Sequence, residues 1–120
     1  MAGHYLRQRV EVNDDDRTVA TAEVTTSEGS GGTAWVSLRA EAGHIAPGRR
    51  ASLVDAVLDL PEVQESARLE AAFRLGDSES LLRLQERCED DRTNPAGWSA
   101  LFDANLPSSG AGQDNSGSPA

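Results

Sequence analysis

Apolar and polar residues alternate along four stretches of the chain, residues 5–12, 18–26, 33–41 and 68–75. Alternation with a period of two predicts strands that bury one face and expose the other. The short links between the first three stretches favour an antiparallel meander. The side chains expected to face inward include Leu6, Val10 and Val12, then Ala20, Ala22 and Val24, then Ala34, Val36, Leu38 and Ala40, and finally Leu69, Ala71, Phe73 and Leu75.

A helical period replaces the alternation twice in the second half of the chain. The first predicted helix has Pro47 in its first turn and ends at Pro61, and the second opens with Asp77 or Ser78 as N-cap. A last short strand is expected over residues 98–103. The apolar sides are Leu53, Val54, Val57 and Leu58 in the first helix, Leu81, Leu84, Gln85 and Cys88 in the second, and Trp98, Ala100 and Phe102 in the strand.

The resulting order of elements is β-β-β-α-β-α-β. It predicts an α/β (α+β) two-layer sandwich, in which two helices cover one face of a five-stranded, mostly antiparallel sheet. The acidic residues 89–91 oppose the negative end of the second helix, so fraying is expected there. We expect one domain over residues 1–106 and a disordered tail over residues 107–120, which is rich in Ser, Gly and Asn.

The charge balance narrows the classes of partner. The formal net charge is −9, which argues against binding to nucleic acid or to an anionic membrane. All eleven basic residues are arginine, so lysine chemistry is absent from the sequence. Cys88 is the single cysteine, and no apolar run approaches the roughly 18 residues of a membrane span. These features predict a cytoplasmic protein.

No catalytic constellation emerges from the residue types and their spacing. His4 and His44 are the two histidines, forty positions apart, and neither has a metal-binding context. Cys88 lies on the apolar side of a helix, where burial raises the pKa of a thiol. We therefore assign no catalytic residue, no metal and no cofactor from the residues alone.

The outward face of the predicted sheet is the leading candidate for binding. Arginine and aromatic side chains together are typical of protein–protein hot spots. The alternative is a solvated surface of cross-strand ion pairs with the glutamates of the same face. The leading hypothesis is a non-catalytic domain that binds a protein partner or a second copy of itself. The candidate residues are Tyr5, Arg7, Arg9, Trp35, Arg39, Arg68 and Arg74.

The loop before the first helix offers a second candidate, an anion site. A helix N-terminus presents free N–H groups to an anion, and two arginines there reinforce the attraction. The alternative is that both arginines are ordinary exposed residues of a first turn. The candidate residues are His44, Gly48, Arg49 and Arg50.

Between residues 33 and 102 the chain has a predicted strand, a helical segment, a second strand and a second helical segment. The first helical segment reads P-G-R-R-A-S-L-V-D-A-V-L and the second reads G-D-S-E-S-L-L-R-L-Q-E-R-C. This order resembles the second half of a GNAT-type N-acetyltransferase. In that family, a glycine-rich loop holds the pyrophosphate of acyl-CoA through backbone N–H groups. The resemblance implies acyl-CoA or another phosphoanion at residues 43–50. The chain departs from the family's loop, because it keeps only Gly48, has Arg50 and Ser52 at positions for small residues, and loses a donor at Pro47.

Overall fold

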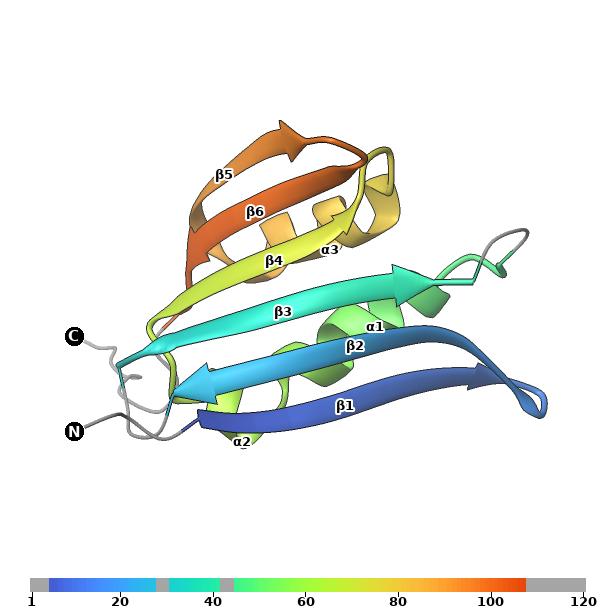
Figure 1. The fold of residues 1–120 in the computed structure, drawn as a ribbon, viewed down its shortest axis with the longest axis horizontal. Coiled ribbons are helices and arrows are strands. Elements are labelled where there is room, and N and C mark those ends of the chain that lie inside the picture. Colours follow the sequence, from blue (N-terminus) through green and yellow to red (C-terminus); the bar gives the residue numbers. More distant parts are fainter. Residues whose placement is uncertain (1–4, 28–30, 42–44, 108–120) are drawn as a thin grey trace, which may run out of the picture.

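A single six-stranded sheet organises the part of the chain that the computed structural model describes, residues 5–27, 31–41 and 45–107. The sheet order is β1-β2-β3-β4-β6-β5 (Figure 1), and every neighbouring pair is antiparallel except β3 and β4. The strands are β1 (Tyr5–Asp14), β2 (Arg17–Ser27), β3 (Thr33–Ala40), β4 (Arg68–Arg74), β5 (Glu89–Ala96) and β6 (Ser99–Asn105), and the helices are α1 (Arg49–Leu58), α2 (Pro61–Gln64) and α3 (Ser78–Arg87).

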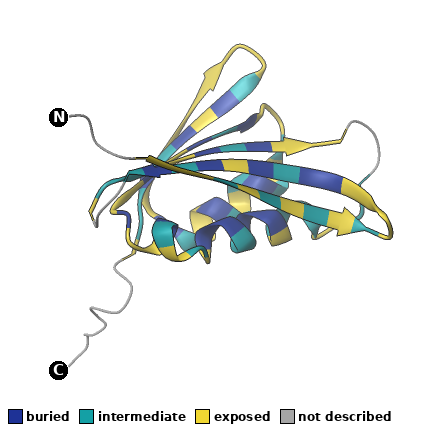
Figure 2. Cartoon of the chain, turned by 60° about the horizontal axis from the view of Figure 1, so that its bottom comes forward, coloured by how far each residue is buried: buried dark blue, intermediate teal, exposed yellow. Residues whose placement is uncertain are grey.

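Both long helices cover the same face of the sheet, so the molecule has two layers (Figure 2). Residues alternate between buried and exposed along the central strands, as a half-covered sheet requires. The predicted fold class and the antiparallel β1-β2-β3 meander are confirmed. The core consists of the inward sides of β2, β3, β4 and β6 together with Leu53, Val54, Val57, Leu58, Val63, Leu84 and Cys88.

Ion pairs join the two helices along their solvent side. Asp55 on α1 accepts hydrogen bonds from the guanidinium groups of Arg83 and Arg87 on α3, at 2.7–2.8 Å. Arg87 also donates to Asp59, the C-cap of α1, at 2.9 Å. The Arg83 hydrogen bond, with that of Arg87, holds the pKa of Asp55 below its usual range. These pairs join the later parts of α1 and α3.

The prediction of five strands and two helices was wrong by one element of each kind. Helix α3 ends at Arg87, and the acidic residues thought to fray its end begin strand β5 instead. Asp90 has a φ of 54°, at a shift in the pairing register of β5 with β6. Every residue of β5 is exposed, so no apolar alternation could indicate this edge strand. Pro61 does not only follow α1, because it also starts the short helix α2.

Residues at the ends of elements depart from the expected inward pattern. Leu75 lies beyond β4 and is 48% exposed, and Trp98 lies in the turn before β6 and is 90% exposed. Leu6, near the start of edge strand β1, is also exposed. Gln85 of α3 is exposed as well, and Pro47 precedes the N-cap of α1 rather than lying in its first turn. The helix and strand patterns hold in the middle of elements and fail where packing stops.

Three expectations fall outside the described residues, namely those for His4, for His44 and for the tail beyond residue 107. Within the described ranges, none of the helices has the length and apolar character needed to cross a membrane.

Candidate functional site

The parallel strands β3 and β4 pair along only part of their length. Their register runs from Thr33 opposite Arg68 to Ser37 opposite Ala72 and then stops. Beyond that pair, β3 stays bonded to β2 as far as Ala40, and β4 stays bonded to β6 as far as its end. The two strands therefore diverge like the arms of a V (Figure 1), and the backbone edges that face each other across the opening lack a strand partner.

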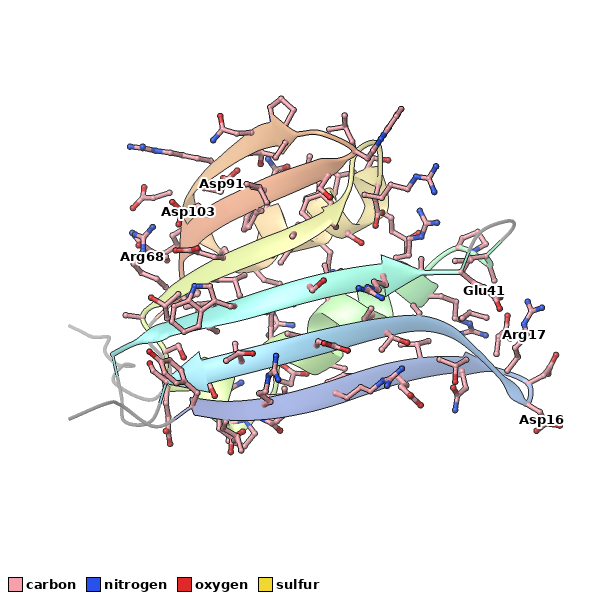
Figure 3. All side chains as sticks on the ribbon, viewed as in Figure 1. Asp16, Arg17, Glu41, Arg68, Asp91 and Asp103 are labelled. Atoms are coloured by element: carbon pink, nitrogen blue, oxygen red, sulfur yellow. The ribbon has the colours of Figure 1, made fainter. Side chains whose placement is uncertain are left out.

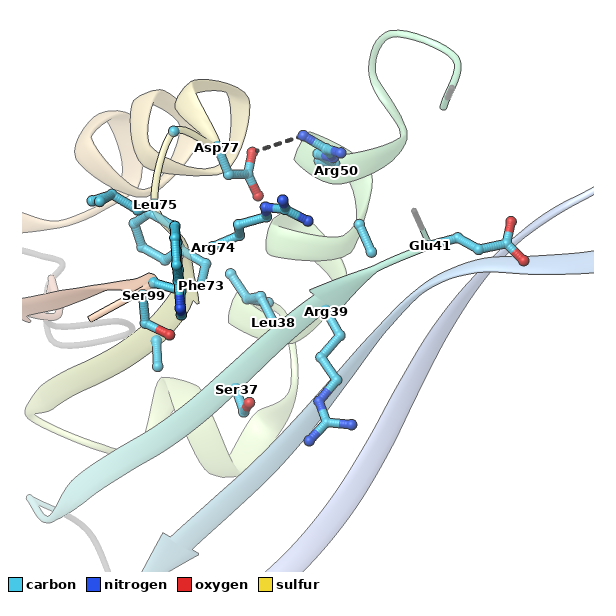
Figure 4. A pocket seen from close by; sticks show the side chains of 14 residues that line it. Ser37, Leu38, Arg39, Glu41, Arg50, Phe73, Arg74, Leu75, Asp77 and Ser99 are labelled. Carbon is cyan, nitrogen blue, oxygen red and sulfur yellow. Dashed lines mark hydrogen bonds and ion pairs between the residues drawn. The ribbon is translucent and has the colours of Figure 1, made fainter. Parts of the chain in front are cut away.

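A cleft of about 910 Å³ occupies this opening (Figure 4). Its lining includes core-side residues such as Leu38 and Phe73 and open-face residues such as Ser37 and Arg39, so it reaches through the sheet between β3 and β4. The remaining lining residues are Ala40, Glu41, Arg50, Ala72, Arg74, Leu75, Gly76, Asp77, Trp98 and Ser99.

The start of α1 lies at the helix side of the cleft. Gly48 is its N-cap with a φ of 91°, a left-handed conformation that favours glycine. The N–H of Arg49 donates to the carbonyl of Ala46 at 3.3 Å, and the N–H of Ala51 donates to the carboxylate of Glu79 at 2.9 Å. A carboxylate from the same chain thus occupies a donor that the N-terminus of a helix usually offers to an anion.

Helix α3 brings a second carboxylate to the same place. Asp77 caps α3 by accepting from the backbone N–H of Ser80 at 3.1 Å and from its hydroxyl at 2.7 Å. The same carboxylate pairs with Arg50 of α1 at 3.4 Å (Figure 4). The starts of α1 and α3 therefore meet through Asp77 and Glu79. These two carboxylates balance the positive charge of Arg50 and of the N-terminus of α1.

Two arginines of the cleft have no such compensation. Arg39 on β3 and Arg74 on β4 form no ion pair with any carboxylate in the described ranges. Both occupy the open-face side of their strand, each two residues beyond the last pair, Ser37 and Ala72. In Figure 4, the guanidinium of Arg74 lies on the side of Asp77 and Arg50, while Arg39 extends away from them. The cleft thus carries uncompensated positive charge at two separate places.

The predicted face residues are all exposed, and along their strands they alternate with more buried residues. Tyr5 and Trp35 bring their rings together, with centroids 6.0 Å apart. Arg9 pairs with Glu11, and Arg68 pairs with Asp103 (Figure 3). Arg9–Glu11 lies within β1, and Arg68–Asp103 joins β4 to β6, so the predicted cross-strand ion pairing accounts for one of the two pairs. Arg39 and Arg74 differ from the rest of the set because they also line the cleft.

A groove of about 590 Å³ crosses the open face beside the cleft. It runs past Trp35, Glu70 and Leu101, and it shares Ser37 and Ala72 with the cleft. The point where β3 and β4 part is thus reached both from the helix side and from the open face.

Three of the four residues predicted for the anion site lie within the described structure. Gly48, Arg49 and Arg50 lie at the start of α1, and His44 lies outside the described residues. Arg50 lines the cleft, whereas Arg49 turns to β1 and pairs with Asp14 at 3.3 Å. Sequence reasoning missed Asp77 and Glu79 as anions of this site. The N-cap signal at residue 77 was visible, but nothing in the sequence placed α3 beside the start of α1.

The six-stranded, mostly antiparallel sheet with its helices has a GNAT-like fold, as its similarity to solved structures shows. No family model and no curated protein matches the sequence significantly. Solved structures do match the fold, and the expected resemblance to GNAT-type N-acetyltransferases is confirmed at that level.

Three of these structures show the extent of the likeness. An acetyltransferase of the GNAT family from Streptococcus pneumoniae is 8% identical, with a TM-score of 0.58, 84% of this chain covered and 67% of that one. A ribosomal-protein-alanine N-acetyltransferase from Brucella melitensis is 11% identical, with a TM-score of 0.57 and coverages of 84% and 69%. A Salmonella typhimurium protein described as an acetyltransferase, solved with its cofactor acetyl-CoA, is 11% identical, with a TM-score of 0.58 and coverages of 92% and 70%.

Proposed function

We propose that this domain binds an acyl-CoA thioester in the cleft between β3 and β4. The observation that carries the proposal is the split itself, in which two parallel strands part and leave unpaired backbone edges around a cleft. The volume of about 910 Å³ lies within the range of about 300–1,000 Å³ common for sites that hold small molecules and cofactors. The Salmonella neighbour of the same fold was solved with acetyl-CoA.

The chemistry of the lining matches the parts of such a ligand. The arm of coenzyme A carries two amides, and the backbone groups of Leu38 and Arg74, which point away from β2 and β6 and toward the opening, can pair with amides as a strand would. Its phosphates are anions, and Arg50 at the start of α1 and Arg74 at the end of β4 both line the cleft. The thioester end would then lie near Ser37 and Ala72, where the strands part.

The start of α1 is a poor binding site for a phosphate. Pro47 supplies no N–H, and the N–H of Ala51 already donates to Glu79. A phosphate at this helix must therefore displace a carboxylate or rely on the arginines. We expect an affinity below that of a site with a free helix start, and we expect Arg74 to supply much of it.

Titration calorimetry with acetyl-CoA tests the proposal. We expect saturable binding, and about tenfold weaker binding after Arg74→Gln, the loss typical of one charge-assisted contact. Arg92→Gln is the matched control, since Arg92 is also exposed, has no ion pair in the described ranges and lies outside the cleft lining. Absence of binding to the unaltered domain at millimolar acetyl-CoA would refute the proposed function.

A second candidate function, self-association through the open face, is favoured by the Tyr5–Trp35 contact. Tyr5 and Trp35 are 62% and 39% exposed, and exposed aromatic residues of this kind are enriched among the hot spots of protein interfaces. We expect Trp35→Ala to weaken a dimer without altering the thermal melting temperature by more than a few degrees. Sedimentation equilibrium decides, because a monomer at high concentration would dismiss this candidate.

A further inference from the structure

Arg39 is placed where the cleft opens onto the uncovered face of the sheet. It lies two residues beyond Ser37, which is the last residue of β3 that pairs with β4. Arg39 and Ser37 therefore lie on the same face of the sheet. It lines both the cleft and a shallow groove over β2 that contains Glu23. Figure 4 shows its guanidinium extending away from Asp77 and Arg50. Arg39 therefore belongs to a different end of the cleft from the arginines assigned to the phosphates.

The charge of Arg39 is uncompensated in a protein rich in carboxylates. The formal net charge of the chain is −9, and on the same sheet Arg9, Arg17 and Arg68 each pair with a carboxylate. Arg7, Arg74 and Arg92 share the lack of an ion pair in the described ranges, but of these three only Arg74 also lines the cleft. Glu41, two positions further along the chain, pairs with Arg17 instead. Within the described ranges no carboxylate lies within 4.0 Å of the Arg39 guanidinium. An anion from outside the chain is the group that this position can accept.

The surroundings favour a carboxylate over a phosphate. The planar guanidinium matches either group by two parallel hydrogen bonds. A phosphate carries up to two negative charges, and the second would lie on the side of the sheet that already holds Glu23 and Glu41. One carboxylate balances one guanidinium, and the hydroxyl of Ser37 on the same face can donate a further hydrogen bond.

We propose that Arg39 binds a carboxylate carried by the ligand at the open-face end of the cleft. The substrate class is thus an acidic one, in which the carboxylate belongs either to the acyl group of the thioester or to a second molecule that meets the thioester from the open face. This inference rests on the proposed function, and it names the specificity of the same cleft.

Calorimetry with two probes distinguishes the two sources of the carboxylate. The first compares succinyl-CoA, whose acyl group ends in a carboxylate, with acetyl-CoA. The second adds glutarate, a dicarboxylate without an amine, to the domain saturated with acetyl-CoA. Each titration is repeated with Arg39→Gln and with Arg92→Gln as the matched control. Thermal melting confirms that both variants fold, as expected for exposed arginines without ion pairs.

If the acyl group carries the carboxylate, succinyl-CoA binds about tenfold more tightly than acetyl-CoA, and Arg39→Gln removes that preference while Arg92→Gln keeps it. If the second molecule carries it, glutarate binds the acetyl-CoA complex and Arg39→Gln abolishes that binding. If acetyl-CoA binds but neither probe responds to Arg39→Gln, the carboxylate inference is overturned and the proposed function stands. If no CoA ester binds the unaltered domain, the proposed function itself falls.

Discussion

Replacement of Glu79 by glutamine separates the stability of the fold from the affinity of the cleft. The carboxylate of Glu79 accepts from the N–H of Ala51 at 2.9 Å, in the first turn of α1. Glutamine keeps an acceptor oxygen but loses the charge that favours the positive end of a helix, which costs about 0.3–1 kcal/mol of unfolding free energy. We therefore expect Glu79→Gln to lower the stability slightly.

The same change should strengthen the binding of a phosphate at α1. The negative charge of the Glu79 carboxylate would repel a phosphate charge about 4 Å away by roughly 4 kcal/mol, at an effective dielectric constant near 20. Screening by salt reduces that figure, so we expect a gain of about 1.4 kcal/mol, which is tenfold in the dissociation constant. The two effects have opposite signs, and a merely structural role for Glu79 would produce only the first.

Urea unfolding and calorimetry with inorganic pyrophosphate measure the two effects on the same samples. Glu86→Gln is the control, because Glu86 lies on the same helix and, within the described ranges, pairs only with Arg83. Glu79→Gln should bind pyrophosphate about tenfold more tightly than the unaltered domain, and Glu86→Gln should not. Loss of stability without any gain in affinity would refute the argument that Glu79 competes with an anion.

Three further predictions concern the fold. The pKa of Asp55 is held low chiefly by its hydrogen bond with Arg83. The ionised Asp55 therefore contributes its full stabilisation above the usual aspartate range, and this contribution is lost as the pH falls through the lowered pKa. Asp55→Asn should flatten that part of the profile of unfolding free energy, measured in urea, against pH. Burial raises the pKa of Cys88 to about 11, so Ellman's reagent at pH 8 should modify it only after unfolding in urea, and rapid reaction of the native domain would contradict its burial. Leu69→Ala, at a fully buried side chain, should cost about 2–5 kcal/mol, whereas Leu101→Ala, at one 47% exposed, should change the free energy of unfolding by about 0.5 kcal/mol or less.

Alternation predicted the central strands well because their pattern reflects a physical constraint. A strand covered on one side must place apolar residues at every second position, and Ala71 and Phe73 of β4 do so. The edge strand β5 escapes this constraint, since nothing covers it and its residues are all exposed. Charged residues and Pro95 along that edge also discourage pairing with other chains, so the sequence there resembles a loop.

The candidate site depends on contacts that no local pattern encodes. The sequence indicated Gly48, Arg49 and Arg50 as an anion site because they precede a helical stripe. Whether that site is open depends on Glu79, which is 28 positions away from Ala51 and reaches it only because α3 packs beside α1. Local chemistry predicts the donors of a site, and tertiary packing decides which of them are already occupied.

The split between β3 and β4 costs the sheet the hydrogen bonds that further pairing would make, so something must oppose closure. Continued register would bring Arg39 and Arg74 side by side on the open face, because each lies two residues beyond the Ser37–Ala72 pair. Like charges on neighbouring strands destabilise a sheet, and these two arginines have no carboxylate partner in the described ranges to relieve the repulsion. The charges that we assign to anionic parts of a ligand therefore also help to keep the cleft open. A bound anion would reduce that repulsion, which links occupation of the cleft to the separation of the two strands.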